Sequence, residues 1–188
     1  MLLYNNSLLF IEIPRTGTTT LRENVQRYKQ PVHALRHVTL NDYLAWHPEH
    51  KGLKTATFVR NPYERVVSLY EHTKHYNQGK KQVSSFEEFV FWLFEDDGVV
   101  LTVDDIRKTQ MDMISIGEVA LIDWIGRFEN YREELNSFLN DFSLVPTSSI
   151  EVNNKLLFSN YKDYYDSELK KLVGGYYEED LDVFKYTY

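Results

Sequence analysis

The chain contains 188 residues, of which 43% are hydrophobic and 26% are charged, and its formal net charge is −7. The length and composition indicate one globular domain, and the acidic balance argues against a general nucleic-acid binder. The lack of cysteine excludes disulfides, thiolate metal sites and a cysteine nucleophile. Residues 1–13 are apolar but too short for a membrane span, and they lack the basic start and cleavage site of a signal peptide. We therefore expect a cytoplasmic protein without a transmembrane segment.

The sequence pattern alternates between strands and helices. Buried strands are predicted over residues 8–13 and 55–59 and within residues 119–129. Helices are predicted over residues 18–28, 62–75, 84–97, 130–142 and 166–184, together with a short helix that begins near Thr39 or Asn41 and ends before Pro48. Thr18 or Thr19 should cap the first helix, a serine should cap the helix over 84–97, and Gly98 should end it. The terminal helix is weakened at Gly174 and Gly175.

This order of elements predicts an α/β domain with a small parallel sheet and helices on its faces. Ligands of such sheets bind beyond the carboxyl ends of the strands. Two polar segments, PRTGTTT over residues 14–20 and RNPYER over residues 60–65, follow predicted strands. We therefore expect both segments at the ligand-binding edge of the sheet.

The first segment has the residues of an anion site. A helix start presents free N–H groups and the positive end of the helix dipole. Gly17 allows the backbone to approach a phosphate closely, Thr18–Thr20 add hydroxyl donors, and Arg15 adds a planar positive charge. The same residues also fit a capped, threonine-rich turn. The segment is not a Walker A loop, because it lacks the G-x-x-x-x-G-K-[ST] pattern.

The second segment pairs an arginine with a serine on the helix that follows. Arg60 stands at a predicted strand end, and Ser68 lies about two helical turns further on. This pair could hold one phosphate from two sides, through charge-assisted bonds and a hydroxyl. Alternatively, Arg60 pairs with Glu64, and Ser68 is merely tolerated.

Considered together, IPRTGTTTL and FVRNPYERVVSLY resemble the 5′-phosphosulfate loop and the 3′-phosphate motif of PAPS-dependent sulfotransferases. PAPS is 3′-phosphoadenosine 5′-phosphosulfate. The resemblance is closest to the carbohydrate branch, which includes heparan and chondroitin enzymes and small soluble bacterial proteins. It continues through FEEFV, IGRFENYREEL and YYDSELKKLVGGYYEEDLDVFKY, and thus covers most of the chain. It implies a single P-loop-like, three-layer domain over residues 1–188.

The resemblance also implies an activity, namely transfer of a sulfuryl group from PAPS to an acceptor hydroxyl. The products are adenosine 3′,5′-bisphosphate and a sulfated acceptor, and no metal is required. The donor-binding residues that it implies are Arg15, Thr16, Gly17, Thr18, Thr19, Thr20, Arg60 and Ser68. Arg15 occupies a position where the family usually has lysine, and it would stabilise the leaving oxygen.

A base should remove the proton of the acceptor hydroxyl. The segment HVTLNDYL resembles the histidine-containing stretch of the family, so His37 is the first choice for the base and His33 is the second. A surface or capping role for His37 is the alternative. Glu12 is the third candidate, although a salt bridge accounts for it better. His47 and His50 also lie between the two motifs.

The acceptor is not readable from the sequence, but a chain close to the bare core of the family favours an open cleft and a glycan. Lys80 and Lys81 could attract an acidic acceptor, although a solvated lysine pair is the more common situation. Three alternatives to the enzyme stay open at this point. One is a non-catalytic relative that binds only the nucleotide or a glycan, another is a P-loop small-molecule kinase, and the last is a structural domain.

Overall fold

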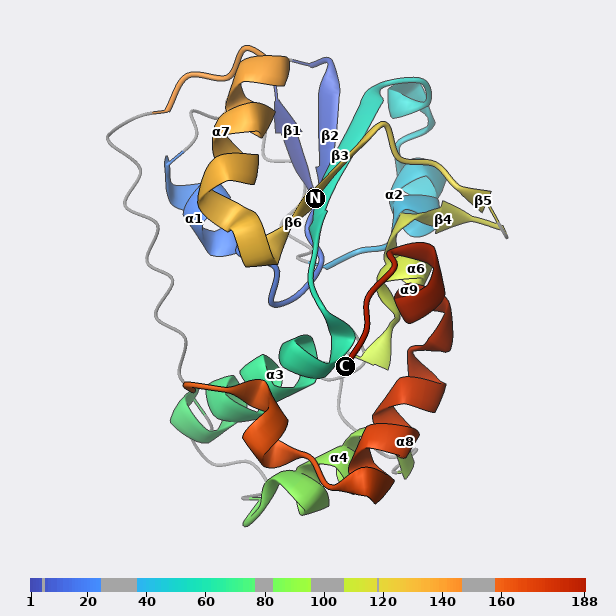
Figure 1. The fold of residues 1–188 in the computed structure, drawn as a ribbon. Helices are drawn as coiled ribbons and strands as arrows, with labels where there is room; N and C mark the ends of the chain where they lie inside the picture. Colours follow the sequence, from blue (N-terminus) through green and yellow to red (C-terminus); the bar gives the residue numbers. More distant parts are fainter. Residues whose placement is uncertain (5, 25–36, 77–82, 96–106, 118, 147–157) are drawn as a thin grey trace. The chain divides into compact units, whose positions relative to one another are not determined.

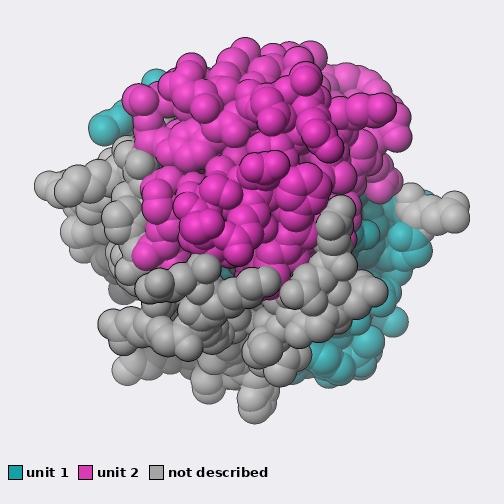
Figure 2. All heavy atoms as spheres, turned by 90° about the horizontal axis from the view of Figure 1, so that it is seen from below, with its two compact units in different colours: residues 1–60, 110–153 teal, residues 61–109, 154–188 magenta. Residues whose placement is uncertain are grey.

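A computed structural model of the chain describes residues 1–4, 6–24, 37–76, 83–95, 107–117, 119–146 and 158–188. The chain forms two compact units, which Figure 2 colours separately. Unit 1 comprises residues 1–60 and 110–153, and unit 2 comprises residues 61–109 and 154–188. Because each unit uses two stretches of chain that are distant in sequence, no single boundary in the sequence separates them. The single domain over residues 1–188 stays a prediction.

Unit 1 is an α/β structure, as predicted. Its strands are β1 (Leu2–Tyr4), β2 (Leu8–Ile11), β3 (Lys54–Val59), β4 (Ser115–Ile116), β5 (Val119–Ala120) and β6 (Trp124–Arg127). Its helices are α1 (Thr18–Asn24), α2 (Leu40–Trp46), η1 (Pro48–His50), α6 (Gln110–Ile114), η2 (Phe128–Asn130) and α7 (Tyr131–Asp141). The main sheet has the order β1-β2-β3-β6, in which β2, β3 and β6 run parallel, whereas β4 and β5 form a separate antiparallel pair.

The core of unit 1 lies between the sheet and the helices α1 and α7, which cover the same face in Figure 1. Alternate residues of β2 and β3 point toward these helices, and the ring centroid of Phe138 on α7 lies 5.5 Å from that of Phe10 and 6.0 Å from that of Phe58. The intervening residues Leu9 and Ile11 are also buried. Burial on both faces is typical of parallel strands and explains why these strands read as continuous apolar runs.

The first strand was not predicted, and the parallel sheet carries one antiparallel strand at its edge. The interpretation of residues 8–13 as the only strand before Pro14 overlooked a hairpin, in which Tyr4 is paired with Leu8. The turn between them places Asn6 at φ 51°, a region that asparagine tolerates, and the Ser7 N–H donates to the Tyr4 carbonyl at 3.1 Å. β2 itself ends at Ile11, two residues earlier than predicted.

The described residues of unit 2 are helical. They form α3 (Pro62–Tyr76), α4 (Phe86–Glu95), η3 (Tyr161–Tyr164), α8 (Ser167–Tyr176) and α9 (Glu178–Val183). Helices α3, α4 and α8 pack around an apolar cluster that includes Val67, Phe89 and Val173. Asn61 precedes α3, and its side-chain oxygen accepts from the Tyr63 N–H at 3.0 Å. Pro62 therefore occupies the first turn, as predicted, where its missing N–H has no cost.

The structure confirms some of the predicted helix caps and corrects others. Thr39 caps α2 and accepts from the Asp42 N–H at 3.1 Å, and the Ser85 hydroxyl accepts from the Glu88 N–H at 3.1 Å, so both predictions are confirmed. The predicted cap of α1 was wrong, because α1 begins at Thr18 and Gly17 precedes it. The terminal helix is divided at Tyr177, while both glycines lie inside α8. The predicted helix ends at Tyr28 and Gly98 lie outside the described residues.

Candidate anion site and its neighbouring base

The loop over residues 12–17 connects β2 to α1 at the carboxyl end of the sheet, as predicted. Two of its residues have left-handed backbone angles, Arg15 at φ 68° and Gly17 at φ 84°. The Thr16 side chain is fully buried, and its hydroxyl donates to the Ile13 carbonyl at 2.9 Å. The Thr16 side chain therefore fixes the turn and is not exposed to a ligand. A non-glycine residue in the left-handed region is a form of strain that is frequent at functional sites.

Gly17 is held against two aromatic side chains. The Tyr131 hydroxyl donates to the Gly17 carbonyl at 2.7 Å. A Cβ atom at position 17 would lie only 2.6 Å from the Tyr131 ring and 3.1 Å from the Phe128 ring. Glycine is thus required here both by its backbone angle and by the close approach of the rings. The sequence predicted the glycine but not its aromatic neighbours, because α7 follows Gly17 by more than a hundred residues.

We expect Gly17→Ala to lower the free energy of unfolding by about 2–4 kcal/mol, from a strained backbone angle and a clash with a buried ring. Gly52→Ala is the matched control, since Gly52 has φ 88° but nothing within 4 Å of a Cβ atom. Gly52→Ala should lower the free energy of unfolding by only about 1–2 kcal/mol, because it strains the backbone angle without causing a clash. Urea unfolding of both variants measures the difference. Equal losses would contradict the role assigned to the Tyr131 and Phe128 rings.

Arg60 follows β3 and contacts the candidate anion loop (residues 12–17) within unit 1. Its guanidinium Nη1 donates to the Arg15 carbonyl at 3.1 Å. The guanidinium lies over the Phe128 ring, with Cζ 4.2 Å from the ring centroid. Its backbone is fixed by the buried amide of Gln110, which accepts from the Arg60 N–H and donates to the Arg60 carbonyl, both at 2.9 Å. The structure thus joins Arg15 and Arg60, which the sequence separates by 45 residues. Gln110 was missed, since no local pattern marks it.

Ser68 lies on α3 of unit 2 and is buried, with 5% of its surface exposed. Its neighbour Arg65 is also buried and donates to the Lys108 carbonyl at 3.0 Å. Ser68 and Arg60 belong to different units, and their predicted pairing on one phosphate stays a prediction.

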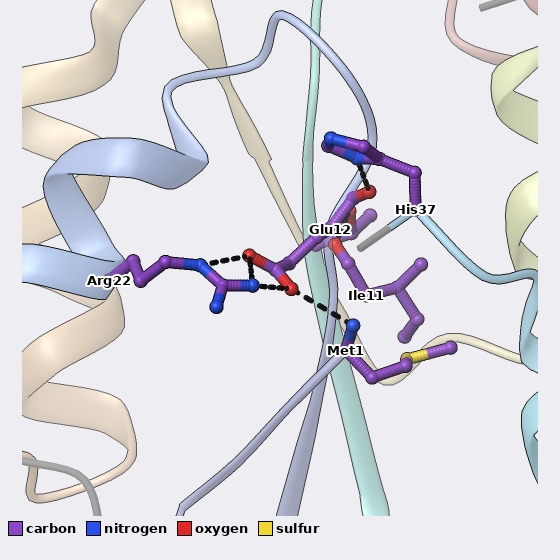
Figure 3. Close-up of polar contacts among 6 residues, drawn as sticks. Met1, Ile11, Glu12, Arg22 and His37 are labelled. Atoms are coloured by element: carbon purple, nitrogen blue, oxygen red, sulfur yellow. Dashed lines mark hydrogen bonds and ion pairs between the residues drawn. The ribbon is translucent and has the colours of Figure 1, made fainter. Parts of the chain in front are cut away.

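Glu12 is an ion-pair residue rather than a free carboxylate (Figure 3). It is buried, and it accepts from the terminal ammonium of Met1 at 2.9 Å and from Arg22 Nε at 3.0 Å, with Arg22 Nη2 in contact with both carboxylate oxygens. Burial alone would raise the pKa of the Glu12 carboxyl, but the Met1 ammonium and the Arg22 hydrogen bonds outweigh it and lower this pKa. A lowered pKa makes Glu12 a poor proton acceptor, so the salt-bridge interpretation is confirmed.

We expect Glu12→Gln to lower the free energy of unfolding at pH 7 by about 3 kcal/mol, because it leaves buried cationic partners without their anion. Because the folded-state pKa is lowered, the carboxylate stabilises the protein above its ordinary pKa of 4.5, and this contribution is lost as the pH falls through the folded value. The gap between wild type and variant should therefore close in acid. Glu133→Gln, at an exposed position on α7, should stay within about 0.5 kcal/mol of wild type. A Glu12→Gln variant as stable as wild type would contradict the assignment.

His37 lies beside the same carboxylate residue, in the turn before α2 (Figure 3). Its Nδ1 atom is 2.8 Å from the Glu12 backbone carbonyl oxygen. A carbonyl only accepts, so Nδ1 carries the proton of this hydrogen bond. In the neutral ring the lone pair is then on Nε2, which is the form that a general base requires. His33, the second candidate for the base, lies outside the described residues, as do Lys80 and Lys81.

In the part of the chain that the structure describes, none of the helices combines the length and apolar character that a membrane crossing requires.

Comparison with known proteins identifies a family for the chain. The model of one family, described as the sulfotransferase family, matches residues 3–187. The match includes both polar segments and extends over both units, and it confirms the resemblance seen in the sequence. No curated protein and no solved structure matches the chain.

Proposed function

Because its residues 3–187 match the family model, the chain belongs to the sulfotransferase family, and we propose that it transfers a sulfuryl group from PAPS to a carbohydrate hydroxyl. The observation that carries this proposal is the direct bond from Arg60 to the Arg15 carbonyl. This bond joins Arg60 to the loop over residues 12–17, so the two segments assigned to the donor lie in contact. Neither motif by itself distinguishes an anion site from a capped turn.

The anion loop and Arg60 provide the donor site in this proposal. Backbone N–H groups from Thr16 to Thr20, at the start of α1, bind the 5′-phosphosulfate. Arg60 and Ser68 bind the 3′-phosphate, which distinguishes this donor from ordinary adenine nucleotides. Arg60 is 2% exposed, and a charge in such surroundings attracts a phosphate more strongly than a charge in water.

The reaction is an in-line displacement at sulfur. The acceptor oxygen forms a bond to sulfur while the bond from sulfur to the bridging phosphate oxygen breaks, so negative charge develops on that bridging oxygen. Arg15 stabilises this charge without donating a proton, since a guanidinium stays charged at neutral pH. His37 takes the proton of the acceptor hydroxyl at Nε2. Adenosine 3′,5′-bisphosphate and the sulfated acceptor leave.

A second candidate function is suggested by Arg15, which replaces the lysine that is usual in the family. A non-catalytic relative would bind adenosine 3′,5′-bisphosphate but would not transfer sulfate. A P-loop kinase is disfavoured, because residues 14–20 lack the Walker lysine.

The test begins with the melting temperature of the protein during titration with adenosine 3′,5′-bisphosphate, with 5′-AMP and ATP as controls. A ligand that binds only the native state raises the melting temperature by mass action. A rise with the bisphosphate alone supports the donor site, and a screen of glycan acceptors with PAPS labelled in the sulfate then separates an enzyme from a binding relative. No rise with any of the three nucleotides would refute the proposal.

A further inference from the structure

A compact group of metal-binding side chains lies in unit 1, immediately after α2. His47, Glu49 and His50 each offer one ligand atom, and these atoms lie within 4.8 Å of one another. His47 Nδ1 and Glu49 Oε1 lie 3.1 Å apart and share a hydrogen bond. These residues belong neither to the anion loop nor to the proposed base, so the proposed function leaves them without a role.

The backbone that carries these side chains is a defined turn. His47 ends α2, and its N–H donates to the Tyr43 carbonyl at 2.9 Å. Pro48 begins η1, and the His50 N–H closes the turn on the His47 carbonyl at 3.0 Å. The fixed backbone angle of proline restricts the turn further. The two imidazoles are therefore presented by a fixed backbone.

Tyr43 orients both rings. Its ring centroid lies 4.9 Å from that of His47 and 5.7 Å from that of His50, and the two imidazole centroids are 5.5 Å apart. The Tyr43 hydroxyl is 2.8 Å from His50 Nδ1. When Nδ1–H donates to the phenol oxygen, the lone pair is on Nε2. A histidine that ligates a metal through one nitrogen commonly donates its other N–H in this way.

We propose that His47, Glu49 and His50 bind a divalent transition-metal ion, and specifically Zn²⁺. Two imidazoles and one carboxylate are ligands that Zn²⁺ favours, whereas Mg²⁺ and Ca²⁺ prefer oxygen alone. In a tetrahedral zinc site neighbouring ligand atoms are about 3.4 Å apart, which is close to the separation of His47 and Glu49. The Glu49 side chain is 62% exposed and is hydrogen-bonded within the group to His47, so a small shift of this side chain can close the wider gaps between ligand atoms. Water completes the coordination, and the ion joins the end of α2 to η1.

The test uses the untagged full chain, stripped with EDTA and dialysed, and titrated with ZnCl₂ in a calorimeter. Wild type should bind one equivalent, and its melting temperature should rise. His47→Ala and His50→Ala should each weaken binding by at least about tenfold, and Tyr43→Phe by about tenfold while keeping the ring. Substitution with Co²⁺ should give the visible absorption of a tetrahedral site in wild type and lose it in the histidine variants.

His72→Ala is the matched control, because it removes a histidine of α3 outside the group and should bind Zn²⁺ as wild type does. Glu49→Gln is the second variant of the group. Because its side chain is exposed, this variant should fold and should bind Zn²⁺ more weakly, even if a histidine variant fails to fold. The proposal is overturned if wild type takes up no Zn²⁺. It is also overturned if the folded variants of the group bind as tightly as wild type, since other residues would then hold the ion. Neither outcome affects the sulfotransferase proposal, which is tested by nucleotides.

Discussion

Replacing His37 by asparagine is expected to lower kcat for sulfate transfer by about 10²- to 10⁴-fold, the usual contribution of a general base. Asparagine retains an N–H for the Glu12 carbonyl and tolerates the left-handed angle of His37, φ 65°. It offers no basic nitrogen in place of Nε2. The variant therefore removes proton transfer and preserves the local structure. The measurement is transfer from labelled PAPS to the acceptor found in the glycan screen.

The control for this variant is its affinity for adenosine 3′,5′-bisphosphate, which should match that of wild type because His37 is not assigned to the donor site. The melting temperature without ligand should change little. Wild-type kcat in His37→Asn would show that the base is another residue, and His33 would be the next to test. A fall in nucleotide affinity together with kcat would instead assign His37 to donor binding.

Replacing Arg60 by alanine is expected to weaken binding of adenosine 3′,5′-bisphosphate at least about 30-fold, as for truncation of a buried charge that contacts an anion. The variant should also lose its preference for the bisphosphate over 5′-AMP, because only the 3′-phosphate distinguishes the two ligands. Ser68→Ala should reduce the same preference by a smaller factor, through loss of one hydroxyl. Isothermal titration with both nucleotides measures these preferences.

Arg65→Ala is the matched control for Arg60→Ala. Arg65 is equally buried, and it also donates to a backbone carbonyl, that of Lys108. Its loss should destabilise unit 2 and leave the preference for the 3′-phosphate unchanged. If the Arg60→Ala variant still prefers the bisphosphate, then Arg60 does not bind the 3′-phosphate and serves only to hold the Arg15 carbonyl. The 3′-phosphate would then be bound elsewhere.

Local sequence signals predicted the elements of the fold well where the chain itself provides the cause. The β-branched run of β3, the Thr39 cap of α2 and the proline at the start of α3 each act within a few residues, and the structure confirms them. The hairpin of β1 and β2 was missed although Asn6 carries a turn signal, because only the apolar residues after this turn were interpreted as a strand.

Some residues of the candidate site could likewise be identified from local sequence signals, and others could not. The glycine and the arginines of the two motifs were identified from the sequence, since residue type and spacing relative to a helix start indicate an anion site. Gln110, Phe128 and Tyr131 were not identified, although they hold Arg60 and Gly17 in place. Each is more than 49 residues from the residue that it contacts, and an apolar or amide side chain on a helix has no pattern that names its partner.

By itself the sequence determined the family, most of the strands and helices, and the residue types at the two strand ends, because all of these depend on short-range periodicity, caps and motifs. Only the tertiary structure decided what those residues do to one another. It placed the Arg60 guanidinium on the Arg15 carbonyl, and it set the His37 proton on Nδ1. It also paired Glu12 with the Met1 ammonium and with Arg22, which together lower the pKa of the Glu12 carboxyl. Burial and hydrogen-bond partners fix charge and tautomer, and they arise only when distant segments of the chain pack together.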